Sequence, residues 1–199
     1  MRSSRKLVAL LAGALLAVNV LAQQVEPEEL VKKVTSEVLD AIKSDRELQA
    51  GDRKKALALA EHKVLPHVDF AKACQLAVGR SWAGASAEQR ERLVKEFRTM
   101  LVRIYSNAID TYRGQTMKVH PVRMSPGAAE VTVRNQYFRP GAPPVPVEYA
   151  MHKTPEGWKI YDIVVEGVSL VLTYRSEFEQ VSRQSGVEGL IKRLADKNA

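Results

Sequence analysis

The positions of hydrophobic residues divide the chain into a helical first part and a second part built mainly of strands. In the first part, hydrophobic side chains recur every three or four positions, which is the spacing of an amphipathic helix. This spacing predicts helices over residues 27–50, 53–65, 70–78 and 87–112. Helix-breaking residues separate the first three, at Gly51, Pro66 and Gly79. The chain therefore starts with a run of packed helices.

The longest predicted helix begins at a capping box, in which Ser86 and Gln89 satisfy each other's end amides. One face of this helix carries a wide hydrophobic stripe that includes Phe97, Tyr105 and Tyr112. Such a stripe is suited either to fill a core or to line a cavity. The opposite face is rich in arginine, and we interpret it as a solvated surface.

From residue 115 onward the hydrophobic period changes from about four to two, which indicates strands. Four strands are predicted, over residues 117–121, 130–137, 146–152 and 158–165. Because short turns connect them, we expect an antiparallel meander with one buried face. Helices, then a curved four-stranded sheet, then helices give an α+β fold in a single domain over residues 23–199.

The fourth predicted strand is hydrophobic on both faces, so we expect it to lie centrally. Strict alternation places Ile160 and Val164 on one face and Tyr161, Ile163 and Val165 on the other.

A helix is predicted to follow this strand after a turn at Glu166 and Gly167, with Ser169 as its N-cap. Gly186 is expected to end that helix, and a last helix is predicted over residues 187–197.

The N-terminal segment has the layout of a secretory signal: a short basic stretch, a hydrophobic run and a cleavage site near Ala22. We expect residues 1–22 to be removed; an uncleaved anchor is the alternative. Removal of Arg2, Arg5 and Lys6 lowers the formal charge from +7 to +4. So mild a charge, on an exported protein, argues against nucleic acid as a partner.

Residues suited to metal or nucleophile chemistry are sparse. The four histidines are scattered, so no metal site is expected, and the sequence contains no glycine-rich phosphate loop. Cys74 is the only cysteine, and we interpret it as a small buried residue. These observations predict no catalytic residues.

Five stretches resemble the MlaC family, also called the toluene-tolerance family. The most specific is the run IYDIVVEGVSLVLTYRSEF at residues 160–178, and the others are residues 65–70, 78–82, 86–90 and 97–105. The resemblance covers almost all of the chain after the signal.

The resemblance implies a periplasmic phospholipid carrier, with bound phospholipid as cargo and no other cofactor. Its implied partners are an inner-membrane ABC transporter complex and an outer-membrane lipoprotein–porin complex, between which it would maintain outer-membrane lipid asymmetry. The implied fold is similar to a nuclear-transport-factor-two-like cone around a hydrophobic pocket. We expect a monomer that approaches membranes transiently and is not an enzyme. Another lipid, such as a hopanoid, is an alternative cargo.

The predicted lipid pocket combines the stripe of the long helix with the inward-facing residues of the sheet and the segment after it. Its residues are Phe97, Leu101, Ile104, Tyr105, Val131, Val133, Val147, Tyr149, Met151, Ile163, Val165, Leu170 and Tyr174. The residues by themselves favour simple packing of these side chains in a core, whereas the family resemblance favours a cavity.

Two other functions remain as alternatives. Cone folds of this type also house isomerases and dehydratases, and here Asp162 or Tyr161 would be the base. Neighbours on a strand point to opposite sides, so we expect only one of the two to reach a pocket, and we expect Asp162 to be a structural carboxylate paired with an arginine. The second alternative is an adaptor that binds partners through its basic helix face.

Overall fold

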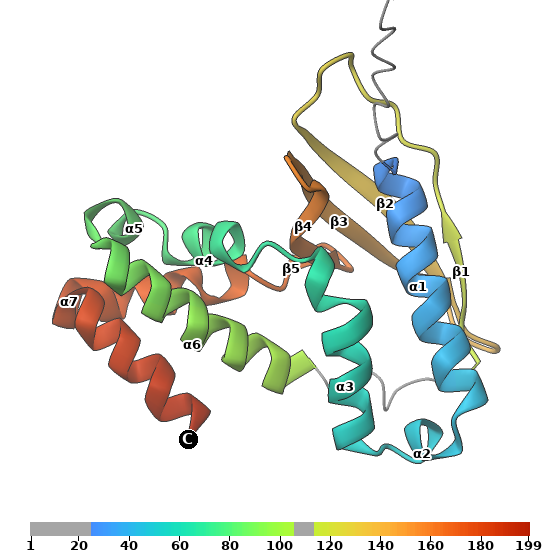
Figure 1. Cartoon of the computed structure of the whole chain (residues 1–199), viewed down its shortest axis with the longest axis horizontal. Helices are drawn as coiled ribbons and strands as arrows, with labels where there is room; N and C mark the ends of the chain where they lie inside the picture. Colours follow the sequence, from blue (N-terminus) through green and yellow to red (C-terminus); the bar gives the residue numbers. More distant parts are fainter. Residues whose placement is uncertain (1–24, 106–113) are drawn as a thin grey trace, which may run out of the picture.

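The computed structural model describes residues 25–105 and 114–199 and has two parts, an antiparallel sheet and a layer of helices (Figure 1). The layer consists of helices α4 (Phe70–Val78), α5 (Ser81–Gly84), α6 (Ala87–Tyr105) and α7 (Arg175–Asn198). Helices α1 (Pro27–Ser44), α2 (Arg46–Gln49) and α3 (Arg53–Lys63) and the 3-10 turn η1 (Leu65–His67) lead from the sheet to this layer. The predicted signal, residues 1–22, and the last turns of the long helix lie outside the described residues.

The sheet is a meander whose strands pair in the order in which they occur in the chain. Its strands are β1 (Thr116–Val119), β2 (Glu130–Phe138), β3 (Val145–Thr154), β4 (Gly157–Val165) and β5 (Val168–Ser169). The α+β fold is confirmed, with one more strand than the four predicted. The extra strand has two residues, too few to show a hydrophobic period. It follows a tight turn in which both Glu166 and Gly167 have positive φ.

A β-bulge in β4 changes which residues share a face. Met151 pairs with Ile160, but the preceding Ala150 pairs with Asp162, so Tyr161 is the extra residue. Beyond the bulge, Ile163 pairs with Tyr149. Ile160 therefore shares a face with Ile163 and Val165, and the assignment by strict alternation was wrong.

Helix α1 lies against the sheet near β1 and β2, and together they form one hydrophobic core (Figure 1). Val31 of α1 is buried there against the inner face of the sheet. The inner face carries Val133, Val147, Tyr149, Met151, Trp158 and Ile160.

The helical layer has a second core, in which Leu93, Phe97, Phe178, Leu190 and Leu194 are almost inaccessible to solvent. Edge-to-face contacts join the Phe97 ring to the rings of Phe178 and Tyr174. No helix within the described residues is long and hydrophobic enough to cross a bilayer.

Several predicted helix ends are confirmed by their hydrogen bonds. Ser86 and Gln89 form the capping box of α6, with N–H to side-chain oxygen distances of 2.9 and 3.2 Å. Asp69 caps α4 by accepting from the amide of Lys72. Gly186 interrupts α7 with φ 67° and ψ −174°, as predicted.

Helix α7 folds back on itself at this break. The ion pair between Lys197 and Glu177, with atoms 2.6 Å apart, joins its two halves.

Candidate functional site

A hydrophobic cavity of about 230 Å³ lies where the sheet, the connecting helices and the helical layer meet. Its lining is drawn from α1, α3, η1, α4, α6, β4 and the segment that follows β5. The lining residues are Val38, Leu59, Ala60, Val64, Leu65, Val68, Phe70, Ala73, Leu101, Val102, Tyr105, Ile160, Tyr161, Asp162, Ile163, Leu170 and Val171. It is therefore bounded by residues from both parts of the molecule.

Helical spacing explains how two of the walls form. On α6, Leu101 and Val102 precede Tyr105 by four and three positions, so both lie on the same side of the helix as Tyr105. Ala60 of α3 and Val64, the C-cap of that helix, are four positions apart in the same way. The two faces contribute hydrophobic side chains to a single cavity. An apolar ligand bound there would be shielded from water.

The third wall is the bulged part of β4, continued by Leu170. The amide of Asp69 donates to the carbonyl of Ile160 at 2.8 Å, which fixes the start of α4 beside this wall. The amide of Leu170 donates to the carbonyl of Ile163 at 2.8 Å, which holds the segment after β5 against the same strand.

Asp162 is the one carboxylate among the lining residues that the structure describes, and both of its oxygens accept hydrogen bonds. The Ser169 hydroxyl donates to it at 2.6 Å, and the amides of Ile163 and Val171 donate at 2.8 and 3.2 Å. The Ser169 oxygen also accepts from the amide of Leu172. Asp162 thus connects β4 by hydrogen bonds to β5 and the segment after it. Its partners are these donors and not the arginine that we had expected.

The structure also corrects the expectation that Tyr161 and Asp162 cannot reach the same pocket. Both contribute to the lining of the cavity. The bulge at Tyr161 breaks the alternation on which that expectation rested. With its oxygens bonded to three protein donors, Asp162 is nevertheless poorly placed to act as a general base.

Two aromatic residues of the lining each carry a cation over their ring. The guanidinium of Arg98 lies 5.7 Å from the centroid of Phe70, and Lys72 Nζ lies 4.7 Å from that of Tyr161. Lys72 also forms an ion pair with Glu130, at 2.5 Å. A hydrogen bond from Lys72 lowers the pKa of the Glu130 carboxyl, and burial raises the pKa of the Tyr161 hydroxyl.

The structure distributes the thirteen predicted pocket residues over several places. Leu101, Tyr105, Ile163 and Leu170 line the cavity. Six pack in the core between the sheet and α1, namely Val131, Val133, Val147, Tyr149, Met151 and Val165.

The remaining three belong to α6 and the segment before α7. Phe97 is buried in the helical core, with Tyr174 packed against it, and Ile104 is 45% exposed. Burial is the main cause that raises the pKa of the Tyr174 hydroxyl, and a hydrogen bond with Tyr105 raises it further. That contact places Tyr174 beside a lining residue.

Sequence reasoning missed the contribution of the connecting helices. Leu59 and Ala60 of α3, its C-cap Val64, and Phe70 of α4 line the cavity, although the spacing predicted only core packing for them. Residues that line a cavity and residues that fill a core have the same hydrophobic character and spacing. No signal in a single sequence separates them.

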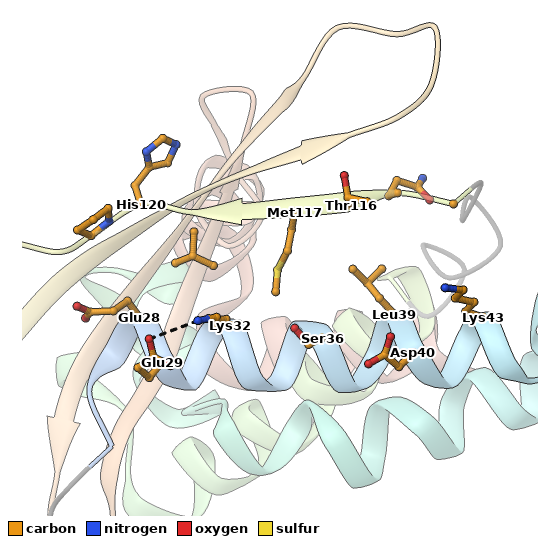
Figure 2. A pocket seen from close by; sticks show the side chains of 14 residues that line it. Glu28, Glu29, Lys32, Ser36, Leu39, Asp40, Lys43, Thr116, Met117 and His120 are labelled. Atoms are coloured by element: carbon orange, nitrogen blue, oxygen red, sulfur yellow. Dashed lines mark ion pairs between the residues drawn. The ribbon is translucent and has the colours of Figure 1, made fainter.

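A larger groove, of about 700 Å³, runs between α1 and the edge strand β1 (Figure 2). Figure 2 shows Met117 of β1 facing α1, where Leu39 is flanked by charged and polar side chains. Glu29 and Lys32 form an ion pair at 3.8 Å across one turn of the helix. The charged side chains of its α1 wall make this groove less suited to hydrocarbon chains than the smaller cavity, despite its size.

The described residues offer neither a reactive cysteine nor a metal site. Cys74 is fully buried, and burial raises the pKa of its thiol to about 12, which disfavours the reactive thiolate. Over the described ranges, no group of three or more His, Cys, Asp or Glu side chains is placed to hold a metal ion.

Comparison with known proteins identifies relatives over nearly the whole chain. The profile of the MlaC protein family matches residues 32–196. The intermembrane phospholipid transport system binding protein MlaC of Haemophilus influenzae is 21% identical over 184 residues, which cover 91% of this chain and 86% of that protein. The toluene tolerance protein ttg2D of Pseudomonas putida is 26% identical over 162 residues, which cover 80% of this chain and 74% of that one.

The fold has a solved counterpart. The phospholipid-binding protein of Ralstonia solanacearum, whose structure is a complex with a phospholipid, superimposes with a TM-score of 0.79. It is 35% identical, and the match covers 87% of this chain and 97% of that one. The profile match over most of the sequence and this structural likeness lead to one conclusion: the chain belongs to the MlaC protein family.

Proposed function

We propose that this chain is a periplasmic carrier that holds the acyl chains of a phospholipid in the cavity between its sheet and its helical layer. The observation that carries the proposal is the nature of the lining, in which hydrophobic side chains surround a carboxylate whose oxygens are already bonded. A relative of 35% identity with the same fold was solved with a phospholipid bound.

Energetics explain why such a carrier needs an enclosed site. Each methylene removed from water contributes about 0.8 kcal/mol, so two acyl chains cannot cross an aqueous compartment unshielded. The cavity, at about 230 Å³, is smaller than the roughly 300–1,000 Å³ of small-molecule pockets. We therefore expect its walls to move apart when lipid enters.

The name of a relative, an intermembrane phospholipid transport system binding protein, supports a route between two membranes. We propose that this chain exchanges lipid with an inner-membrane ABC transporter complex and an outer-membrane lipoprotein–porin complex. It would do so as a monomer without enzymatic activity, after removal of its signal near Ala22.

Filling the cavity tests the proposal. Ala60 lines the cavity, whereas Ala58 on the same helix is exposed. Ala60→Trp places an indole ring where acyl chains would lie, so we expect at least a tenfold loss of phospholipid taken up from vesicles, on the scale of about 1.4 kcal/mol. Uptake is measured by mass spectrometry of lipid extracted from the re-purified protein.

Ala58→Trp is the matched control, because it adds the same side chain outside the cavity. It should take up as much phospholipid as the unmodified protein. Equal uptake by both variants, with both folded by circular dichroism, would show that acyl chains do not occupy this cavity. Recovery of a different lipid class, such as a hopanoid, would keep the carrier role and change its cargo.

A further inference from the structure

The described part of the cavity lining can hold hydrocarbon but offers no cation to balance the charge of a phosphate. None of the lining residues within 25–105 and 114–199 is Lys, Arg or His. An unpaired phosphate inside it would lose its hydration without gaining a partner, which is strongly unfavourable. If the chain carries phospholipid as proposed above, the phosphate must therefore stay at the rim, within reach of a cation outside the lining.

Arg98 lies where such a cation is needed. It precedes Leu101, Val102 and Tyr105 on α6 by three, four and seven positions, so it continues the face of the helix that lines the cavity. Its guanidinium lies 5.7 Å from the ring centroid of Phe70, itself a lining residue. The charge is thus held next to the cavity wall but remains exposed to water.

Arg98 also has no carboxylate partner among the described residues, unlike Lys72 of α4 and Arg92 of α6. Lys72, above the Tyr161 ring, is paired with Glu130, and Arg92 of α6 is paired with Glu188. No carboxylate of residues 25–105 or 114–199 forms an ion pair with Arg98. Arginine also suits a phosphate, because its planar guanidinium can donate two parallel hydrogen bonds to the oxygens.

We propose that Arg98 binds the phosphate of the carried lipid at the rim of the cavity, with the Phe70 ring holding the guanidinium in place. Arg98 is then a residue that selects phosphate-bearing lipids over neutral lipids with the same chains. This inference rests on the carrier function proposed above.

The test compares two ligands that differ only in the phosphate-bearing headgroup. Short-chain phosphatidylglycerol and diacylglycerol with the same acyl chains are titrated below their aggregation concentrations, so that no membrane surface contributes. Arg98→Gln keeps much of the side chain over Phe70 and removes the charge. We expect its affinity for phosphatidylglycerol to fall about two- to fivefold, the range of an exposed charge pair, while its affinity for diacylglycerol stays unchanged.

Two further variants sharpen the result. Lys192→Gln removes one positive charge at an exposed position of α7, and it should leave both affinities unchanged. Arg98→Lys keeps the charge and should restore part of the preference for phosphatidylglycerol. With Arg98 intact, that preference should weaken as salt is added.

The outcomes separate this inference from the carrier function. If the unmodified protein binds neither ligand, the carrier function itself fails and the inference fails with it. If it binds both and Arg98→Gln lowers the two affinities equally or not at all, the phosphate contact is overturned while the carrier function stands. An equal loss of phosphatidylglycerol affinity in Lys192→Gln would also overturn it, because net charge would then explain the effect.

Discussion

At the scale of single residues, Asp162 shows how a polar group can belong to the wall of a hydrophobic cavity. Three donors meet its oxygens, from Ser169, Ile163 and Val171. Those bonds close the β4–β5 turn and hold the following segment beside the cavity. The carboxylate therefore has a structural role in this wall.

Replacement of Asp162 by Asn tests this role. The amide has one oxygen in place of two, so at least one donor loses its acceptor in a buried place. We expect the free energy of unfolding to fall by about 1–3 kcal/mol, measured by urea denaturation, while the folded variant keeps its lipid uptake. Asp196→Asn, at an exposed position of α7, is the control and should be neutral. Normal stability with loss of a turnover reaction would instead favour an enzyme.

Residue-scale predictions succeeded where the partner is close in sequence. The Ser86–Gln89 capping box and the Asp69 cap are local, so spacing alone was enough to find them. The partners of Asp162 are up to nine positions away, across a turn. These donors reach Asp162 only because the chain folds back at β5, and the spacing did not predict that turn. The prediction of an arginine partner for Asp162 was therefore wrong.

At the scale of elements, the β4 bulge is the feature missed by the sequence analysis that most changed the site, because it decides which residues share a face of the strand. Tyr161 has a high strand propensity, so the pattern continued through it without a break. The bulge is visible only in the pairing with β3. One inserted residue moved Ile160 to the face of Ile163, which explains why both line the same cavity.

The break in α7 was predicted, and it leads to a test. Gly186 has φ 67° and ψ −174°, a region that only glycine occupies readily. Gly186→Ala should lower the free energy of unfolding by about 1–3 kcal/mol, measured by urea denaturation. The added methyl meets no atom within 4 Å, so backbone strain alone causes the loss.

Gly84→Ala provides the comparison for this prediction. Gly84 lies in helix α5, has no positive φ and also has open space around it, so alanine should be neutral or slightly stabilising there. If both substitutions had the same effect, the break at Gly186 would not require glycine.

At the scale of the whole molecule, the change of hydrophobic period was enough to predict an α+β fold with helices at both ends. The same pattern was not enough to find the cavity. Four of the thirteen predicted residues line it, while α3 supplies lining residues that the spacing assigned to a core. A cavity forms where neighbouring elements stay too far apart for their side chains to fill the space. The pattern of residue types contains no information about that distance.

The cavity lies between two hydrophobic cores, one of the sheet with α1 and one of the helical layer. A third, smaller cluster around Ile42, Leu48 and Ala56 borders it through Val38 and Leu59. Each core is closed by its own contacts, and the hollow remains at their junction. A carrier would benefit from this arrangement if the cores moved apart when lipid enters, because the cavity between them would widen. The function we propose is therefore a consequence of incomplete packing between two well-packed parts.

The most direct measurement is the mass of lipid that accompanies the protein after gentle purification from cells. We predict that phospholipid co-purifies at about one molecule per chain, the arrangement expected for a single enclosed site. Protein stripped of lipid should recover phospholipid from vesicles. If no lipid accompanies the protein and none is taken up from vesicles by folded protein, the central claim is contradicted.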